Sequence, residues 1–225
     1  MKKTITSLLL IIFMSTFSQG QTSVITVSPN SSVVAVSADS LVLNKSSEML
    51  DENTYWAIIE NSIKNTSSQE DQEIYLIAEL EKLSPKEIIG FRLRTDKLLY
   101  DTYNQELWCA AYIVNDGSTD GGFDYFRCWL ISKGKDAYYS AVKNPDSILQ
   151  IIDASKEDEF EFEGFAYVAV SAFKALTTHE LFDFIDYNNF TTNDENYPIL
   201  KFAWNVDEPE TMQKVCPKLY DRFIK

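Results

Sequence analysis

Two apolar segments joined by a short polar loop, in residues 107–134, constrain the fold of this chain more than any other feature. Apolar residues in 107–114 recur every three to four positions, which favours a buried helix over a strand. Residues 115–122 are rich in Asn, Asp, Gly, Ser and Thr, which compete with helical hydrogen bonds and form loops. Residues 123–133 return to helical spacing, and Gly134 follows where helices often end. We therefore predict an antiparallel helical hairpin, because a short loop places its two helices side by side.

The rest of the sequence predicts further helices and no second domain. Ser84, Pro85 and Glu87 form a helix-start signature, in which serine caps the helix, proline occupies its first turn and glutamate reaches back. An apolar stripe with helical spacing runs through residues 162–176. We expect a mostly α fold, a single-domain bundle of about seven helices around the hairpin. Its other helices are expected near residues 51–65, 68–83, 84–99, 135–142 and 208–215.

The N-terminus has the pattern of a secretory signal peptide. Lys2 and Lys3 precede an apolar run at residues 8–13, which is too short to span a bilayer. We predict a signal peptide at residues 1–20, a flexible Ser/Val-rich tether at residues 21–48 and a helical domain at residues 49–225. The protein is then expected to be exported, either periplasmic or secreted, with no membrane insertion after signal cleavage.

The chain is acidic, with 34 Asp and Glu residues against 20 Lys and Arg residues and a net charge of −14. Loss of Lys2 and Lys3 with a signal peptide would make this charge more negative. A negative surface repels nucleic acids and anionic membranes, so we expect no nucleic acid partner. The same charge permits cationic partners, metal ions, an unknown protein partner, or a role limited to solubility.

Charged residues in and after the central loop are the candidates for a functional site. Asp116 and Asp120 lie in the loop, where acidic residues also serve simply as loop formers. Asp124, Arg127 and Trp129 lie in the second apolar segment, and Arg127 stands two residues before Trp129. We take all five as binding candidates, and Asp120, Asp124 and Arg127 as weak catalytic candidates.

Arg127 has two interpretations. An arginine among aromatic residues needs a partner, because an unpaired buried charge is costly. One interpretation is a buried ion pair with an acid such as Asp124 or Glu163. The other is a fork that recognises an anion in a cleft beside Trp129.

The sequence shows no motif for a metal, a cofactor or nucleophilic catalysis. The loop matches several positions of a helix–loop–helix calcium site, but Arg127 stands where that site needs a bidentate glutamate. We therefore predict no metal and no cofactor. His179 is the single histidine and follows a predicted helix, where histidine is usually a surface or capping residue.

The central motif resembles a known family. The resemblance lies in Leu107-Trp108, Ala110-Ala111-Tyr112, the loop at residues 117–123, Phe126-Arg127 and the segment at residues 129–134, and it extends to residues 144–147 and, more weakly, to Trp56 and residues 217–220. These features resemble the family called domain of unknown function 4240, over about residues 55–225. The resemblance implies no activity. The chain departs from the family in having Asp120-Gly121 where two acidic residues are usual.

The cysteines are a second departure, because Cys109 and Cys128 replace residues that are usually small in the family. Cys109 lies six residues before Asn115 and Cys128 lies six residues after Gly122, so the two are level in an antiparallel hairpin. We predict a Cys109–Cys128 disulfide with Cys216 left free. The alternative is that both are buried free thiols, which pack as small apolar side chains.

Two functions from different classes fit these observations. The first is a binding or protein-interaction module that uses the loop region at residues 115–127, which predicts an exposed apolar or aromatic patch. The alternative is a hydrolytic enzyme with an acidic site around Asp116, Asp120, Asp124 and Arg127. Such an enzyme predicts a deep cleft in which carboxylates converge, with Arg127 and His179 nearby.

Overall fold

Helices form nearly everywhere that the apolar spacing predicts them. A computed structural model describes residues 43–152 and 160–224, and within these ranges the chain is helical with two isolated β-bridges and no strand. The helices of the described residues are α1 (Glu52–Asn65), α2 (Gln69–Leu80), α3 (Pro85–Asp101), α4 (Gln105–Val114), α5 (Asp120–Ser132), α6 (Lys135–Lys143), η1 (Pro145–Gln150), α7 (Glu163–Thr177), η2 (Leu181–Phe184), η3 (Asp194–Asn196), α8 (Pro209–Val215) and α9 (Pro217–Phe223), where η marks a 3-10 helix. The predicted all-α class is confirmed, with more and shorter helices than the seven expected.

Local side chains explain where the helices begin. Asp51, Ser68, Asn104 and Thr119 each cap a helix by accepting a hydrogen bond from a backbone N–H of its first turn. The predicted signature at the start of α3 is confirmed in full. Ser84 Oγ accepts from Glu87 N at 3.3 Å, and Glu87 Oε2 accepts from Ser84 N at 2.9 Å.

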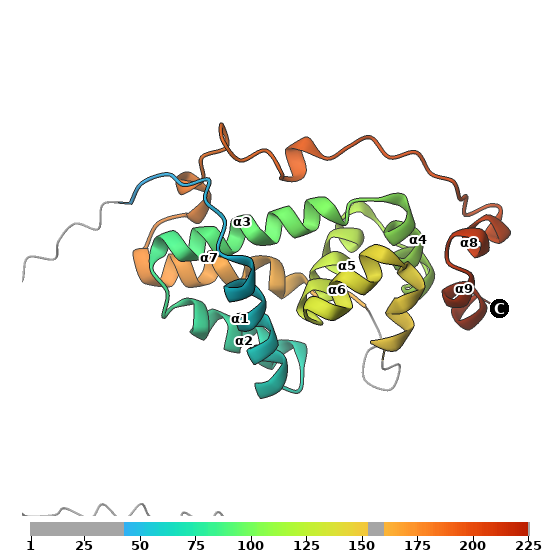
Figure 1. Cartoon of the computed structure of the whole chain (residues 1–225), viewed down its shortest axis with the longest axis horizontal. Helices are drawn as coiled ribbons and strands as arrows, with labels where there is room; N and C mark the ends of the chain where they lie inside the picture. The colour runs from blue at the N-terminus through green and yellow to red at the C-terminus, as the bar shows by residue number, and fades with distance from the viewer. Residues whose placement is uncertain (1–42, 153–159, 225) are drawn as a thin grey trace, which may run out of the picture. The chain divides into compact units, whose positions relative to one another are not determined.

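Helix α7 is the element around which α2, α3 and α5 pack. Figure 1 shows it lying along α3. Phe165, Ala169 and Phe173 of the predicted stripe are buried. Leu176 is 45% exposed, so the stripe ends one turn earlier than the sequence predicts.

The buried face of α2 differs from the one that apolar spacing predicts. The spacing places Ile74 on the core side, but Ile74 is 62% exposed. Gln72 faces inward instead, and its Nε2 donates to Ser62 Oγ at 2.9 Å and to Ser132 O at 3.0 Å. The prediction for Ile74 is wrong because a polar residue with two buried acceptors sets the orientation of the helix.

The central hairpin forms as helices α4 and α5, but its two helices contact different neighbours. Helix α4 packs against η1, α8 and α9, whereas α5 packs against α3, α6 and α7. Cys109 accordingly lies beside Met212 of α8, with 3.9 Å between Cys109 Sγ and Met212 O. Cys128 instead lies near the charged side chains of α3. All three cysteines are buried free thiols in the structure, so it does not form the predicted Cys109–Cys128 disulfide, and the two thiols have different neighbours.

The start of the described chain is held to the domain by backbone contacts. Ser46 N donates to Phe184 O, and Asp186 N donates to Ser46 O, each at 2.9 Å. Leu50 N donates to Gly90 O at 2.9 Å, and a Cβ at position 90 would lie 2.8 Å from Leu50 N. Gly90 therefore allows this segment to approach α3 closely. The predicted signal peptide and residues 21–42 of the predicted tether lie outside the described residues.

None of the helices in the described ranges is long and apolar enough to cross a membrane.

The C-terminal helices dock through a buried carboxylate. Asp146 at the start of η1 accepts hydrogen bonds from Lys218 N at 3.1 Å and from Leu219 N at 3.0 Å, in the first turn of α9. The two motifs near residues 144–147 and 217–220, far apart in the sequence, thus meet in the structure. A carboxylate at this place satisfies backbone N–H groups that the helix itself leaves without acceptors.

Asp146→Ala is expected to lower the free energy of unfolding by about 1–3 kcal/mol, because two backbone donors lose a charged acceptor. Chemical denaturation followed by circular dichroism measures this loss. Asp136→Ala, at an exposed acid of α6, is the control and should stay within about 0.5 kcal/mol of the wild type. Equal losses in both variants would contradict the docking role of Asp146.

Candidate functional site

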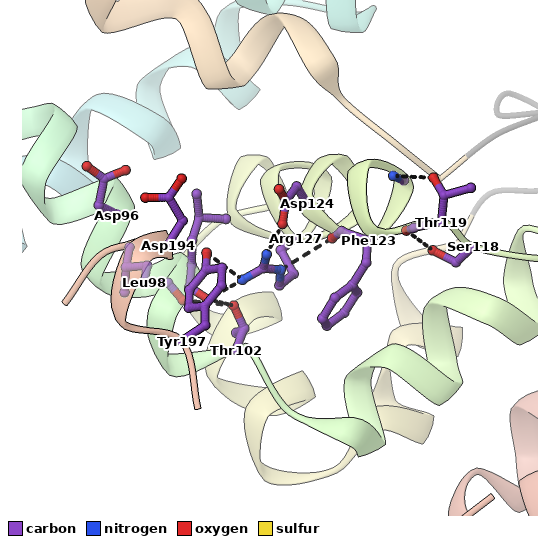
Figure 2. A network of polar contacts seen from close by, with 12 residues as sticks. Asp96, Leu98, Thr102, Ser118, Thr119, Phe123, Asp124, Arg127, Asp194 and Tyr197 are labelled. Carbon is purple, nitrogen blue, oxygen red and sulfur yellow. Dashed lines mark hydrogen bonds and ion pairs between the residues drawn. The ribbon is translucent and has the colours of Figure 1, made fainter. Parts of the chain in front are cut away.

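Arg127 is completely buried and joins three parts of the chain (Figure 2). Its Nη1 donates to Leu99 O on α3 and, at 3.0 Å, to the hydroxyl of Tyr197. Its Nε donates to Phe123 O at 3.3 Å, and its Nη2 is paired with Asp124. The structure thus forms the ion pair with Asp124 that the sequence allows. Because the guanidinium is enclosed and bonded, it does not serve as an open fork for an anion.

Aromatic rings enclose the same guanidinium. Its central carbon lies 4.6 Å from the ring centre of Phe123, 5.0 Å from that of Tyr197 and 5.2 Å from that of Tyr103. Tyr103 and Tyr197 stack on each other, with ring centres 4.0 Å apart and an angle of 8° between the planes. These ring faces attract the cation and offset part of the cost of removing it from water.

A cleft of about 270 Å³ opens beside the Arg127–Asp124 pair. Helices α3, α5 and α7 and the segment between α7 and α8 each contribute to its walls. We call it the acidic cleft, and its lining residues are Arg92, Asp96, Leu99, Gly121, Asp124, Tyr125, Cys128, Ala166, Tyr167, Phe182, Asp194 and Tyr197.

A second ion pair forms the wall of the acidic cleft on α3. Arg92 Nη2 lies 2.8 Å from Asp96 Oδ1, and Asp96 is 7% exposed. Arg92 Nη1 donates to Ala166 O of α7 at 2.8 Å, and its guanidinium lies over the ring of Phe182 at 5.2 Å. Within the described residues, the buried Nε of Arg92 has no hydrogen-bond partner, which leaves a donor for water or a ligand.

Three carboxylates influence one another around the cleft. Burial raises the pKa of Asp96 and of Asp124 above the ordinary value, and the neighbouring guanidinium of each acts in the opposite direction. The charge of Asp194 raises both pKa values further. Figure 2 shows Asp194 of η3 between Asp96 and the Arg127 pair. Each of these two carboxyl groups is therefore harder to ionise in the cleft than in water.

Three other polar side chains of the cleft are uncharged at neutral pH. Burial raises the pKa of Tyr197 to about 12 and that of the Cys128 thiol to about 12. The hydroxyl of Tyr125 donates to Glu163 Oε1 at 3.0 Å, and this bond raises the pKa of Tyr125 to about 12. A thiol with so high a pKa is a poor nucleophile.

The residues singled out in the sequence do not converge on one point. Asp124 lines the acidic cleft, whereas Asp116 lines a separate open hollow of about 470 Å³ at the loop. Asp120 is exposed and lines neither, although its charge raises the pKa of Asp124. Trp129 is fully buried against Phe126 and Phe160 and does not line the cleft.

Asp116 acts as a loop former, which is one of the two roles that its position in the sequence allows. It has a positive φ of 53°, which aspartate tolerates better than most residues. His179 is exposed at the end of α7, with its ring 5.6 Å from that of Phe184, and it lines neither hollow.

The sequence interpretation misses Arg92, Asp96, Asp194 and Tyr197. A signal exists for the first two, because they stand four residues apart on helix α3 and form an ion pair of the kind that this spacing favours. Asp194 and Tyr197 lie in a polar stretch with no periodic pattern. Only the path of the chain past α3 brings them to the cleft.

Three exposed apolar side chains lie in the segment that follows Tyr197. Ile199 is 96% exposed, and Phe202 and Val206 are 49% and 44% exposed. This segment runs past α4, where Trp204 Nε1 donates to Gln105 O at 2.9 Å. These three exposed apolar side chains are not part of the loop at residues 115–122, where the interaction hypothesis expects such side chains.

The described ranges contain no group of three His, Cys, Asp or Glu side chains placed to hold a metal ion.

Comparison with known proteins identifies one family. A family model described as "Protein of unknown function (DUF4240)" matches residues 50–175, which is more than half of the chain. This is the family that the central motif resembles. Neither the curated proteins nor the solved structures include a match to this chain.

Arg127→Lys is expected to lower the free energy of unfolding by about 2–4 kcal/mol, because a lysine cannot reach all the acceptors around the buried guanidinium. Asp124→Asn should cost less, about 1 kcal/mol, since the Asp124 side chain is 51% exposed. Urea denaturation of both variants tests this order. A loss below about 0.5 kcal/mol for Arg127→Lys would show that the network does not hold the domain together.

Proposed function

We propose that this protein, which belongs to the DUF4240 family of proteins of unknown function, is a binding module whose acidic cleft takes a positively charged ligand. The observation that carries the proposal is the position of Asp194. Its carboxylate is close enough to Asp96 and Asp124 to raise the pKa of both. Within the described residues it forms no ion pair with a basic side chain of its own.

The charge balance of the cleft supports a cation. Three carboxylates line it, and two guanidiniums compensate them from the protein side. Of those guanidiniums, Arg127 is enclosed, and Arg92 lines the cleft while Asp96 and Ala166 O hold its Nη atoms. A cation that enters the cleft would relieve the mutual repulsion of the three carboxylates.

The walls of the cleft suit an organic cation. Tyr125, Tyr167, Tyr197 and Phe182 contribute aromatic rings. Ring faces attract ammonium and guanidinium groups, and a volume of about 270 Å³ matches the side-chain end of such a molecule. The negative charge of the whole chain would also favour the approach of a cation.

The hydrolytic alternative has less support from the geometry. Its four residues do not form one site, because Asp116 lies at the loop hollow, Asp120 is exposed and Arg127 is buried. The single histidine is outside the cleft, and the Cys128 thiol has a raised pKa. A protein partner could supply the cation as a lysine or arginine side chain, so the proposal includes a protein-interaction role.

Titration with small probes tests the proposal. We expect butylammonium and butylguanidinium to shift the backbone amide signals of Gly121, Asp124 and Tyr197 in a saturable way by nuclear magnetic resonance, and neutral butanol to shift them far less. Asp194→Asn should weaken the binding of both cations about 3–5-fold, as expected for an exposed carboxylate that loses one charge contact.

Glu195→Gln is the matched control, because it removes the same charge from the next exposed residue, outside the cleft lining. It should leave the affinity within about 1.5-fold of the wild type. If butanol bound as well as butylammonium, or if both variants weakened binding equally, a specific cation site in the cleft would be ruled out.

The pH dependence supplies a second test. A cation binds the ionised carboxylates, so its affinity decreases as they take up protons. Because the pKa values of Asp96 and Asp124 are raised, this loss should begin at a higher pH than for ordinary aspartates. The same titration between about pH 7.5 and about pH 4.5 should show a steady fall in butylammonium affinity. A constant affinity over that range would contradict the role of these carboxylates.

A further inference from the structure

Two of the three cysteines lie side by side at the junction between α4 and the C-terminal helices. Cys109 is on α4, and Cys216 ends α8 and precedes α9; both are completely buried. Cys109 Sγ lies 3.9 Å from Met212 O, and the same carbonyl accepts from Cys216 N at 2.9 Å. Cys216 Sγ lies 3.7 Å from Glu106 O, one turn before Cys109. Each thiol therefore contacts the backbone of the element that carries the other thiol.

The electrostatic environment of Cys216 agrees with this geometry. A hydrogen bond with Cys109 is the largest cause that raises the pKa of Cys216 above its ordinary value, followed by burial. Cys128 lies in a different environment, where it lines the acidic cleft among Arg92, Arg127 and Asp124. The pair is therefore Cys109 and Cys216, and Cys128 is the cysteine left over.

We propose that Cys109 and Cys216 form a disulfide bond that fastens α8 and α9 to α4, with Cys128 remaining a thiol. In exchange with oxidised glutathione, one protein thiolate attacks a glutathione sulfur and releases one reduced glutathione. The second protein thiolate then attacks the mixed disulfide and releases another. Two protein S–H bonds and one glutathione S–S bond break, one protein S–S bond and two glutathione S–H bonds form, and no further oxidant is needed.

The position of the bond gives it a structural purpose. Helices α8 and α9 have seven residues each, and helices of that length depend on docking for their stability. Asp146 holds the first turn of α9, and a Cys109–Cys216 bond would hold the corner before it. Such a bond also closes a long loop of the chain, which reduces the freedom of the unfolded state. The signal peptide predicted from the sequence would bring the chain to a compartment where disulfides persist.

Because both thiols are buried, oxidation is expected during folding rather than in the folded protein. The test is to refold the reduced full chain in a mixture of reduced and oxidised glutathione, block the free thiols and map the peptides by mass spectrometry without reduction. We expect one disulfide between the peptides of Cys109 and Cys216 and one blocked thiol at Cys128. A Cys109–Cys128 bond, or three blocked thiols, would overturn the proposal.

Thermal melts with and without dithiothreitol provide a second measurement. The reductant should lower the Tm of the oxidised wild type and of Cys128→Ser, which keeps the proposed pair. It should leave the Tm of Cys216→Ala unchanged. If Cys216→Ala does not fold, the Tm of Cys128→Ser with and without the reductant still tests the proposal. An unchanged Tm of Cys128→Ser would contradict a stabilising Cys109–Cys216 bond. This result is independent of cation binding, since Cys109 and Cys216 lie outside the cleft lining.

Discussion

The buried guanidinium of Arg127 is the interaction on which the arrangement of this domain depends. It binds the end of α3 through Leu99 O, its own helix through Phe123 O and Asp124, and the segment after α7 through Tyr197. A buried cation without these partners would cost several kcal/mol, so the three elements are held in the one arrangement that satisfies it. The aromatic rings of Tyr103, Phe123 and Tyr197 complete the enclosure.

The acidic cleft follows from this arrangement. Arg127 draws Asp124 and Tyr197 together, and Arg92 holds Asp96 on the adjoining wall. The two guanidiniums thus form their ion pairs and hydrogen bonds within the protein, while the carboxylates of Asp96, Asp124 and Asp194 line the cleft. This division of charge is the physical basis of the proposed cation site.

The C-terminal segment belongs to the same structure although the family model matches only residues 50–175. Asp194 and Tyr197 help to form the cleft, Asp146 holds α9, and Cys216 lies against α4. A chain ending near residue 175 would lose one wall of the cleft and the helices that cover α4. The residues after the matched region therefore complete the site that the matched region begins.

The sequence by itself determines most of the helices, although α5 begins at Asp120, inside the segment predicted as loop. Spacing of apolar residues and local caps act within one or two turns, so α1, α3, α4, α5 and α7 can be predicted, as can the capping box of Ser84 and Glu87.

The packing of the helices, by contrast, decides which helix faces meet. Ile74 points outward because Gln72 finds two buried acceptors, and Cys109 meets Cys216 instead of Cys128 because α4 and α5 contact different neighbours. Asp124 and Arg127 could be recognised as a pair from the sequence, but Asp96 and Asp194 join them only in the folded chain. Such contacts link residues far apart in the sequence, and no local pattern records them.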